Sequence, residues 1–510
     1  MSKGNFAGIA VAIAGILVGA AGVLTVQKAT ERRRMLRTEY QDWRKLNLIL
    51  QKIDENYVDP VDRQKVTDAA VTAALAQLDP HSVYLPPQEL EESETSLAGG
   101  FEGIGIQFNV PNDTAVVIEV IPGGPSEKAG LLPGDRLLKV DSVEIAGRKY
   151  PQDSMVRRMR GPAGTKVTVT VRREAEVIPF EITRGKIPTH SIDAAFMGGD
   201  TTGYIRLSKF ARTTFKEFTE ATAKLKGEGM SELIMDIRDN SGGYLDQALL
   251  LSNAFLEKGD TIVYLEGLHR KREDYTADGR GALKDVRLKV LISDGSASSS
   301  EIFAGAIQDN RRGTIYGRRS FGKGLVQEPV FFTDGSGVRL TVARFYTPSG
   351  RCIQKPYTPD YAYEVYKRYG EAEMVDSDSM KVSKGGIIPD VFVPIDTTRA
   401  SDFYIKCNRK ATTMRFSSAF FDANKAELSA IDDYGELLTY LDRAGLDRQF
   451  LEFARVRDGL VPAKGEWEVS QSYMMTQIKA LVGRYSKLGD NAFYHLYLQI
   501  DDVFAAATAR

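Results

Sequence analysis

The strongest constraint in the sequence is an alternation of apolar segments and helical patterns that begins near Gly203. Residues 233–237 and 288–293 are short and mostly apolar, and a turn that contains glycine follows each of them. Short apolar runs between helical patterns are typical of buried strands in an α/β sheet. We therefore predict an α/β core over residues 185–396.

The length of 510 residues exceeds what one hydrophobic core usually holds, about 250–300 residues, so we expect several domains. Residues 38–98 show helical spacing of apolar side chains, which we expect to break at Pro80, with Pro86 and Pro87 in a loop. Residues 99–184 read as short strands between glycine and proline turns. Helical periodicity returns in residues 397–510, whose role the sequence does not indicate.

The charged, tyrosine-rich stretch at 357–384 reads as an excursion from the core. Together these regions predict a multidomain α+β fold. It would consist of a helical N-terminal region, a mostly β module, an α/β core and a helical C-terminal tail.

The first 28 residues contain a long apolar segment. Residues 6–26 carry no charged side chain, and a helix of that length is about 31 Å long, which matches the hydrocarbon core of a bilayer. We predict a membrane anchor in residues 1–28, with a cleaved secretory signal as the alternative. A basic cluster between Lys28 and Arg37 follows the segment. Read alone, the positive-inside rule would keep the rest of the chain in the cytoplasm.

Composition excludes some classes of function. The chain has 67 Lys and Arg against 68 Asp and Glu, so a nucleic-acid partner is not expected. The two cysteines, Cys352 and Cys407, form no C-x-x-C motif and have no histidine cluster nearby, which argues against a disulfide framework or a zinc site. The sequence does not decide whether the two cysteines form a single disulfide with each other.

A Gly-Ile-Gly-Ile turn at residues 103–106 precedes a strand-like segment, and a second glycine- and proline-rich segment follows at 121–141. A glycine turn can aim consecutive backbone N–H groups at a carboxylate, and the next strand edge can pair with a peptide. The two segments resemble the ligand-binding loop and body of a PDZ domain. The resemblance implies that Ile104, Gly105 and Ile106 bind the C-terminus of a peptide.

Residues 288–307 run from an apolar strand through a turn of small residues into a helix. Several hydrolase folds hold a nucleophilic serine in such a turn, at the helix N-terminus. Serine is also a favoured helix cap, and Ser298 with Glu301 has the spacing of a capping box. The segment therefore fits both catalysis and simple capping.

Lys323 lies between two glycines, 25 positions after Ser298 and four before Gln327. A buried lysine can lose its proton near neutral pH and then serve as a general base. Residues 236–243 form another strand that ends in a glycine turn, whose backbone N–H groups could stabilise an oxyanion.

These motifs resemble those of the carboxyl-terminal processing peptidases, the tail-specific serine peptidases of family S41, over residues 41–394. The match includes the motifs at 78–82 and 386–390. The resemblance implies that Ser298 is the nucleophile, Lys323 the general base and Gln327 the group that orients the lysine amine. Backbone N–H groups of Ser299 and of Gly242 or Gly243 would form the oxyanion hole. Many relatives carry alanine where this chain has Ser299.

The resemblance further implies a serine endopeptidase that cleaves exported proteins near free C-termini, with no metal and no other cofactor. It favours a periplasmic catalytic domain on a membrane anchor, with a soluble periplasmic enzyme as the alternative. It does not decide whether the protein forms a homo-oligomer. One rival is a Ser-His-Asp hydrolase that uses His190 or His269. The other is a PDZ scaffold or holdase with an inactive core.

Overall fold

The computed structural model describes residues 44–509 apart from 111–112, 122, 133, 174 and 358–384. The predicted anchor at residues 6–26 and nearly all of the excursion at 357–384 lie outside the described residues. Two compact units make up the chain, Met1–Leu78 and Asp79–Arg510. In the described part of the chain, no helix has the length and apolar character needed to cross a membrane.

The smaller unit is helical where it is described. Residues 44–56 form one helix, and α2 (Arg63–Leu75) forms another. The side chain of Asp62 caps α2 by accepting a hydrogen bond from the Lys65 N–H at 3.1 Å, as aspartate commonly does at a helix start. This agrees with the helical pattern of the sequence.

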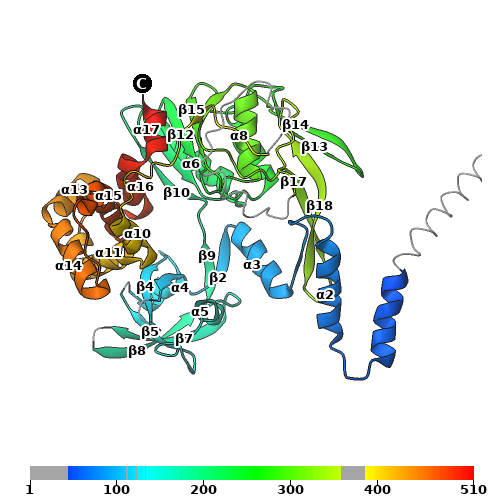
Figure 1. Cartoon of the computed structure of the whole chain (residues 1–510), viewed down its shortest axis with the longest axis horizontal. Coiled ribbons are helices and arrows are strands. Elements are labelled where there is room, and N and C mark those ends of the chain that lie inside the picture. Colours follow the sequence, from blue (N-terminus) through cyan, green and yellow to red (C-terminus); the bar gives the residue numbers. More distant parts are fainter. Residues whose placement is uncertain are drawn as a thin grey trace, which may run out of the picture. The chain divides into compact units, whose positions relative to one another are not determined.

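The larger unit contains the predicted α/β core (Figure 1). Its sheet has six strands in the order β10-β11-β12-β15-β16-β19, and only the β10–β11 pair is antiparallel. The strands are β10 (Ile192–Met197), β11 (Thr202–Leu207), β12 (Glu232–Asp236), β15 (Arg287–Ile292), β16 (Gly313–Gly317) and β19 (Val391–Phe392). The two apolar runs found in the sequence are the central strands β12 and β15.

Successive side chains of the central strands serve two different cores. Leu233 and Val290 pack into a core with helices α6 (Thr214–Gly227), α7 (Leu245–Asn253) and α8 (Ser299–Asp309). Ile234 and Leu291 pack into a second core with residues of α16 (Gly489–Tyr497), η4 (Leu498–Ile500) and α17 (Asp502–Thr508). The C-terminal residues of the chain therefore cover one face of the sheet.

A second, five-stranded sheet has the order β1-β18-β13-β14, with β17 paired to β18. Its strands are β1 (Val83–Leu85), β13 (Thr261–Gly267), β14 (Arg270–Thr276), β17 (Leu325–Phe331) and β18 (Gly337–Tyr346). The loop expected at Pro86 and Pro87 is wrong, because Pro87 begins helix α3 (Pro87–Leu97). Proline suits the first helical position, where its missing N–H would have no intrahelical partner.

The β module is a six-stranded sheet with two short helices around its own core, as predicted. Its elements are β3 (Ile106–Asn109), β4 (Ala115–Val120), α4 (Pro125–Ala129), β5 (Arg136–Val140), β6 (Val143–Glu144), α5 (Gln152–Met159), β7 (Lys166–Arg173) and β8 (Glu176–Thr183). An antiparallel pair, β2 (Gly100–Gly103) and β9 (Gly185–Pro188), carries the chain into and out of the module.

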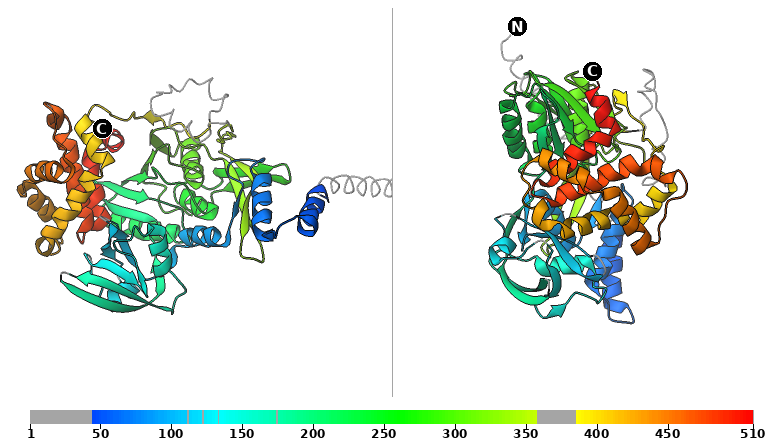
Figure 2. Two further views of the ribbon diagram at one scale, coloured as in Figure 1. Left: turned by 60° about the horizontal axis from the view of Figure 1, so that its bottom comes forward. Right: turned by 90° about the vertical axis from the view of Figure 1, so that its left-hand side faces the viewer.

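The C-terminal region is helical, as its periodicity predicted (Figure 2). Its first helices are α10 (Asp402–Arg409), α11 (Thr412–Ala423), α12 (Lys425–Leu428), α13 (Tyr434–Arg443), α14 (Leu446–Asp458) and α15 (Glu466–Tyr485). The periodic residues Leu428, Leu441, Met474 and Ile478 are buried in one shared core. Cys407 is buried in the same core, and it forms no disulfide with Cys352.

Candidate active site

Ser298 occupies the turn between β15 and α8 as the N-cap of the helix. Its backbone has φ 55° and ψ −114°, a conformation that L-residues rarely adopt and that costs about 1–3 kcal/mol. The capping interpretation of the sequence is confirmed, because Ser298 and Glu301 form a capping box. Catalysis by Ser298 stays a prediction. Strained residues cluster at active sites, where the surrounding structure holds them in place.

Three other serines surround Ser298, and each donates its hydroxyl to the loop that follows β12. Ser296 bonds the carbonyl of residue 237 at 2.8 Å, Ser299 that of residue 243 at 2.9 Å, and Ser300 that of residue 240 at 2.8 Å. No described residue accepts a hydrogen bond from the Ser298 hydroxyl. Ser298 is therefore the serine of this cluster whose proton is not committed to the backbone.

The Glu301 carboxylate joins the serine turn to the lysine loop. Its Oε2 atom accepts hydrogen bonds from the N–H groups of Ser298 and Lys323, both at 2.9 Å. Its Oε1 atom accepts from the Gly322 N–H at 2.7 Å and the Ser320 hydroxyl at 2.5 Å. Burial raises the pKa of Glu301, although these four donors oppose the shift. Sequence reasoning recognised Glu301 only as a cap and missed this bridging role.

Lys323 has the electrostatic surroundings that a general base requires. Burial, and after it the positive charge of Arg339, lowers the pKa of Lys323, while the carboxylates of Glu301 and Asp79 act in the opposite direction. No hydrogen bond joins its Nζ atom to the Ser298 hydroxyl or to the Gln327 side chain. Gln327 lies on β17 and donates its amide to the carbonyl of His81 at 2.6 Å.

Two further residues of this neighbourhood were missed in the sequence. His81 lies near Lys323, and burial together with the lysine charge lowers the pKa of His81 to about 4. Lys355 is fully buried, with its Nζ atom 4.1 Å from the centre of the Phe321 ring. The motif at residues 78–82, which contains His81, was the available signal.

The glycine loop after β12 packs directly on Ser298. A Cβ atom added at Gly242 would lie 2.8 Å from Cβ of Ser298, so only glycine fits there. The Gly242 N–H donates to Oδ1 of Asn240 at 2.9 Å. In contrast, the N–H groups of Gly243 and Ser299 donate to no described residue. Of the two glycines expected as oxyanion donors, Gly243 is the one whose N–H is available.

The histidines of the rival mechanism lie elsewhere. His190 is exposed in the loop before β10, and His269 is exposed in the turn between β13 and β14. Neither of them forms a hydrogen bond with Ser298. The described structure thus gives the Ser-His-Asp interpretation no geometric support.

The expected peptide-binding loop follows β2 directly. Gly105 has φ +77°, and a Cβ atom there would lie 2.8 Å from Cδ1 of Ile187. Ile104 is buried in the core of the module, and Ile106 begins β3, which is an edge strand of its sheet. A free edge next to a glycine turn can take up an extended peptide as an additional strand.

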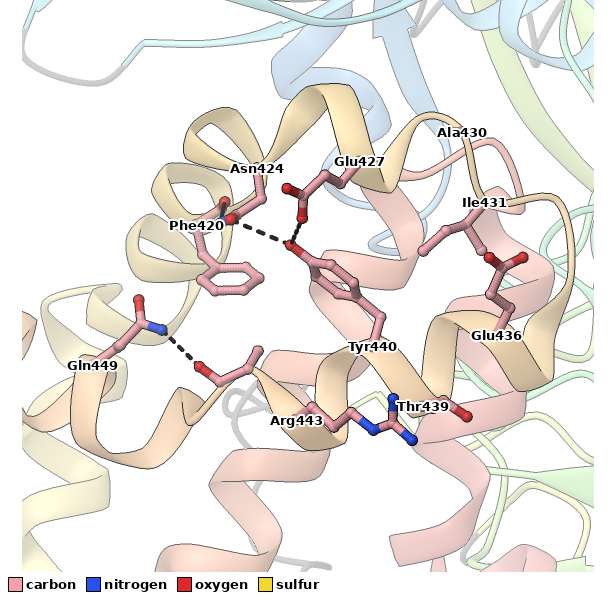
Figure 3. A pocket seen from close by; sticks show the side chains of 11 residues that line it. Phe420, Asn424, Glu427, Ala430, Ile431, Glu436, Thr439, Tyr440, Arg443 and Gln449 are labelled. Atoms are coloured by element: carbon pink, nitrogen blue, oxygen red, sulfur yellow. Dashed lines mark hydrogen bonds between the residues drawn. The ribbon is translucent and has the colours of Figure 1, made fainter.

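Neither of two cavities in the described part of the chain is lined by Ser298. One, of about 1020 Å³, is lined by α3, β2 and β9 and by residues including Arg160 and Tyr244. The other, of about 550 Å³, lies in the C-terminal region, where the Tyr440 hydroxyl bonds Glu427 at 2.8 Å (Figure 3). None of the predicted catalytic residues lines either cavity. In the described residues, no group of three or more His, Cys, Asp or Glu side chains could hold a metal ion.

Residues 201–363 match peptidase family S41, and residues 103–183 match the PDZ domain. These two matches define the chain as a peptidase that carries a PDZ domain. The predicted resemblance to family S41 with a PDZ domain is thereby confirmed.

Two curated relatives narrow the class of peptidase, and the chain is also similar to one solved structure. The carboxy-terminal-processing protease of Bartonella bacilliformis is 36% identical over 381 residues, which are 71% of this chain and 86% of that protein. A probable CtpA-like serine protease of Staphylococcus aureus is 33% identical over 334 residues, 65% of this chain and 66% of that protein. The photosystem II D1 C-terminal processing protease is 28% identical, covers 69% of this chain and 87% of its own, and has a TM-score of 0.39. The chain belongs to the carboxyl-terminal processing peptidases of family S41, which are serine proteases.

Proposed function

We propose that the protein cleaves exported proteins near their free C-termini with a catalytic dyad of Ser298 and Lys323. The observation that carries the proposal is the carboxylate of Glu301, which accepts hydrogen bonds from the backbone of both residues. It brings the backbone of Ser298, whose hydroxyl donates to no described residue, next to the backbone of Lys323, whose pKa burial lowers. A neutral amine beside a hydroxyl is the arrangement that Ser-Lys catalysis requires.

In the proposed reaction, Nζ of Lys323 takes the hydroxyl proton as Oγ of Ser298 attacks the scissile carbonyl carbon. The N–H groups of Gly243 and Ser299 would stabilise the oxyanion that forms. When the C–N bond breaks, Lys323 returns the proton to the leaving amine. Water then hydrolyses the acyl-enzyme with Lys323 again as base. Gln327 would orient the amine once substrate is bound, in addition to its bond to the carbonyl of His81.

Recognition of the substrate tail is assigned to Ile104, Gly105 and Ile106. The larger cavity supports this assignment, since its wall includes β2, which leads into Gly105, and Tyr244, which follows Gly243. A polypeptide held by its C-terminus at the PDZ loop would have room to continue toward Ser298. Substrates would therefore be unfolded or loosely folded tails.

Cleavage of an unfolded protein with a free C-terminus, followed by mass spectrometry of the fragments, tests the proposal. Ser298→Ala removes the nucleophilic oxygen and should abolish cleavage, whereas Ser296→Ala should leave substantial activity. Amidation of the substrate C-terminus should weaken binding and slow the reaction. If Ser298→Ala still cleaves, the dyad is wrong. If free-acid and amidated substrates are cleaved equally well, carboxylate recognition is absent.

We place the catalytic unit outside the cytoplasm, in the periplasm of a Gram-negative-type cell. The apolar residues 6–26 support export, whether they are retained or cleaved. Protease added to spheroplasts should digest the region after Arg37 while the inner membrane is intact. Digestion that requires breaking the inner membrane would refute this location.

A further inference from the structure

Asp501, in the C-terminal region, forms an ion pair with a residue beside the glycine loop of the active site. Its Oδ2 atom accepts a hydrogen bond from Nη1 of Arg238 at 2.7 Å. The Arg238 side chain is 14% exposed and the Asp501 side chain 7%, so the pair is almost completely removed from water. The two residues are separated by 263 positions in the chain.

The pair completes a buried charge network at the carboxyl end of β12. The fully buried Asp236 accepts hydrogen bonds from Nη2 of Arg238 at 2.6 Å and from Nη1 of Arg206 at 2.7 Å. The Tyr204 hydroxyl donates a further bond to Asp236, also at 2.7 Å. Two guanidinium groups therefore surround one buried carboxylate, and Asp501 supplies the second buried negative charge.

A buried charge without a partner is strongly unfavourable, so the network depends on Asp501. Asp239 lies 3.7 Å from Arg206, but its side chain is 73% exposed and cannot replace a buried partner of Arg238. Without Asp501, one guanidinium would be unbalanced directly before the glycine loop. It would then have to move toward water or toward another acceptor.

Arg238 is the residue at which the loop begins. Asp239 follows with φ +57°, a conformation that a non-glycine residue holds only when its neighbours fix it. The fully buried Asn240 then donates to the carbonyl of Leu207 at 3.0 Å, and its own carbonyl accepts from the Ala297 N–H at 2.9 Å. Movement at Arg238 would therefore be passed along to Gly243 and to the turn that carries Ser298.

Asp501 is itself held firmly in the C-terminal region. As the N-cap of α17 it accepts the Phe504 N–H through Oδ1 at 2.8 Å, which leaves Oδ2 for Arg238. Leu498 and Val503 on either side of it are buried in the core that they share with β12 and β15. On β15, Nζ of Lys289 donates to the carbonyl of Ala507 at 2.6 Å. The end of the chain is thus attached to the sheet at several points.

We propose that the C-terminal region braces the catalytic core, with Asp501 as a positioning residue that holds the oxyanion loop in place through Arg238. The proposal rests on the proposed function, which assigns the N–H of Gly243 to the oxyanion hole. It gives the C-terminal helices a part in the chemistry through a side chain that is not itself one of the predicted catalytic residues.

The test compares Asp501→Asn with Asp502→Asn in the full-length protein. Asparagine is as good a helix cap as aspartate, so Asp501→Asn removes the negative charge and keeps the cap. Asp502 begins the same helix, but it pairs with Arg399 at 2.9 Å and is 38% exposed, which makes it a matched control. We expect Asp501→Asn to lower kcat by about 10-fold to 100-fold with KM unchanged, because small displacements of catalytic groups cost about this much. Asp502→Asn should leave both constants near wild type.

Two further readouts separate positioning from a loss of folded protein. Backbone amides of residues 239–243 should exchange hydrogen faster in Asp501→Asn and not in Asp502→Asn. In an Arg238→Lys background, which keeps the charge but loses the planar fork, Asp501→Asn should have little additional effect on kcat. If Asp501→Asn does not fold, Asp501→Glu is measured instead; it keeps the charge but displaces it by one methylene group, so kcat should fall in the same direction by a smaller factor.

The proposal is overturned if the Asp501 variant keeps wild-type kcat, or if its effect adds fully to that of Arg238→Lys. It also fails if Asp502→Asn loses as much activity. Failure of the proposed function would look different, since Ser298→Ala would then retain cleavage whatever the Asp501 variant does.

Discussion

Two glycine loops in this protein present backbone N–H groups, and they are held by different means. The catalytic loop, residues 239–243 with the proposed oxyanion donor Gly243, is fixed by side chains, among them the hydroxyls of Ser299 and Ser300 and the amide of Asn240. The PDZ loop at residues 103–106 is held by backbone contacts. The carbonyls of Ile104 and Gly105 accept N–H groups from the segment at 121–126, at 2.9 and 3.0 Å.

The difference fits the two tasks that we propose for these loops. An oxyanion hole is effective when its donors are fixed before charge develops, and buried side-chain hydrogen bonds provide that fixation. A loop that reads many different tails gains from being able to adjust. Disturbing the side chains around the catalytic loop should therefore reduce the rate of chemistry, whereas disturbing the PDZ loop should reduce binding.

The largest effect in this comparison is expected at Glu301, which has no counterpart in the PDZ loop. In Glu301→Gln, the new NH₂ group faces two buried donors whichever way the amide is turned, because each carboxylate oxygen accepts two bonds. Each unsatisfied donor costs about 1–3 kcal/mol. We expect kcat to fall by about two orders of magnitude, since 1.36 kcal/mol corresponds to a factor of ten. Steady-state kinetics measure this.

Glu328→Gln is the matched control for the Glu301 variant. Glu328 lies on the same β-sheet as the lysine loop, but its side chain is 47% exposed and pairs with Arg270. Its loss should change kcat less than about twofold, because exposed ion pairs contribute about 0–1 kcal/mol. Equal decreases in kcat for the two variants would show that the hydrogen bonds of Glu301 do not contribute to catalysis.

The pH dependence of kcat/KM should move in opposite directions for two neighbours of Lys323. In the proposed mechanism the neutral amine is the active form, so we expect activity to rise as pH increases through the pKa of Lys323. Arg339 lowers that pKa and Asp79 raises it. Arg339→Met should therefore move the rising limb to higher pH, and Asp79→Asn should move it to lower pH. His81, whose pKa is lowered to about 4, is neutral throughout this range.

Asp274→Asn is the control for the two pH profiles. Asp274 is exposed on β14, where it pairs with Arg272. Its replacement should therefore leave the rising limb of the kcat/KM profile at the same pH. Shifts of the same sign for Arg339→Met and Asp79→Asn would show that Lys323 does not set the limb.

In the PDZ loop, Gly105→Val should affect binding more than chemistry. A side chain at φ +77° is strained by about 1–2 kcal/mol and would also collide with Ile187. We expect KM for free-acid substrates to rise by about tenfold, with kcat nearly unchanged. Gly227→Ala, at a position with ordinary φ and open space, should leave KM unaltered. A loss confined to kcat would contradict the division of labour between the two loops.

The smallest effect is expected for Ser300→Ala in the catalytic loop. The change leaves the buried carbonyl of Asn240 with one hydrogen bond fewer, which should lower the free energy of unfolding by about 1–3 kcal/mol. Substantial activity should remain, because the Ala297 N–H still binds the same carbonyl. Urea denaturation measures the free energy of unfolding, and an assay in native buffer measures the activity that remains. Complete loss of activity in the folded variant would mean that Ser300, too, takes part in catalysis.

Local patterns predicted most of the fold and part of the site. The two central strands, the β module and the C-terminal helices were all visible in hydrophobic periodicity and glycine placement. Strand β1 was missed because three residues between prolines carry no usable period, and it forms only by pairing with β18. Pro87 was misread because proline ends some helices and begins others.

Contacts between distant segments could not be predicted in the same way. Glu301 was found as a cap from its spacing to Ser298, but its bonds to the lysine loop depend on how β15 and β17 are brought together. Arg238 and Asp501 are 263 positions apart in the chain, with most of the catalytic core and of the C-terminal region between them. Only the folded chain shows that the tail of unknown role reaches the active-site loop.

The most direct test of the Ser298–Lys323 dyad is the rate of tail cleavage by Lys323→Arg across the pH range in which the protein is folded. The guanidinium keeps the positive charge but stays protonated with a pKa above about 12, so it cannot accept the serine proton. We expect cleavage to be lost at every pH, while His190→Ala and His269→Ala remain active. Near-normal cleavage by Lys323→Arg, or loss of activity in a folded histidine variant, would contradict the account.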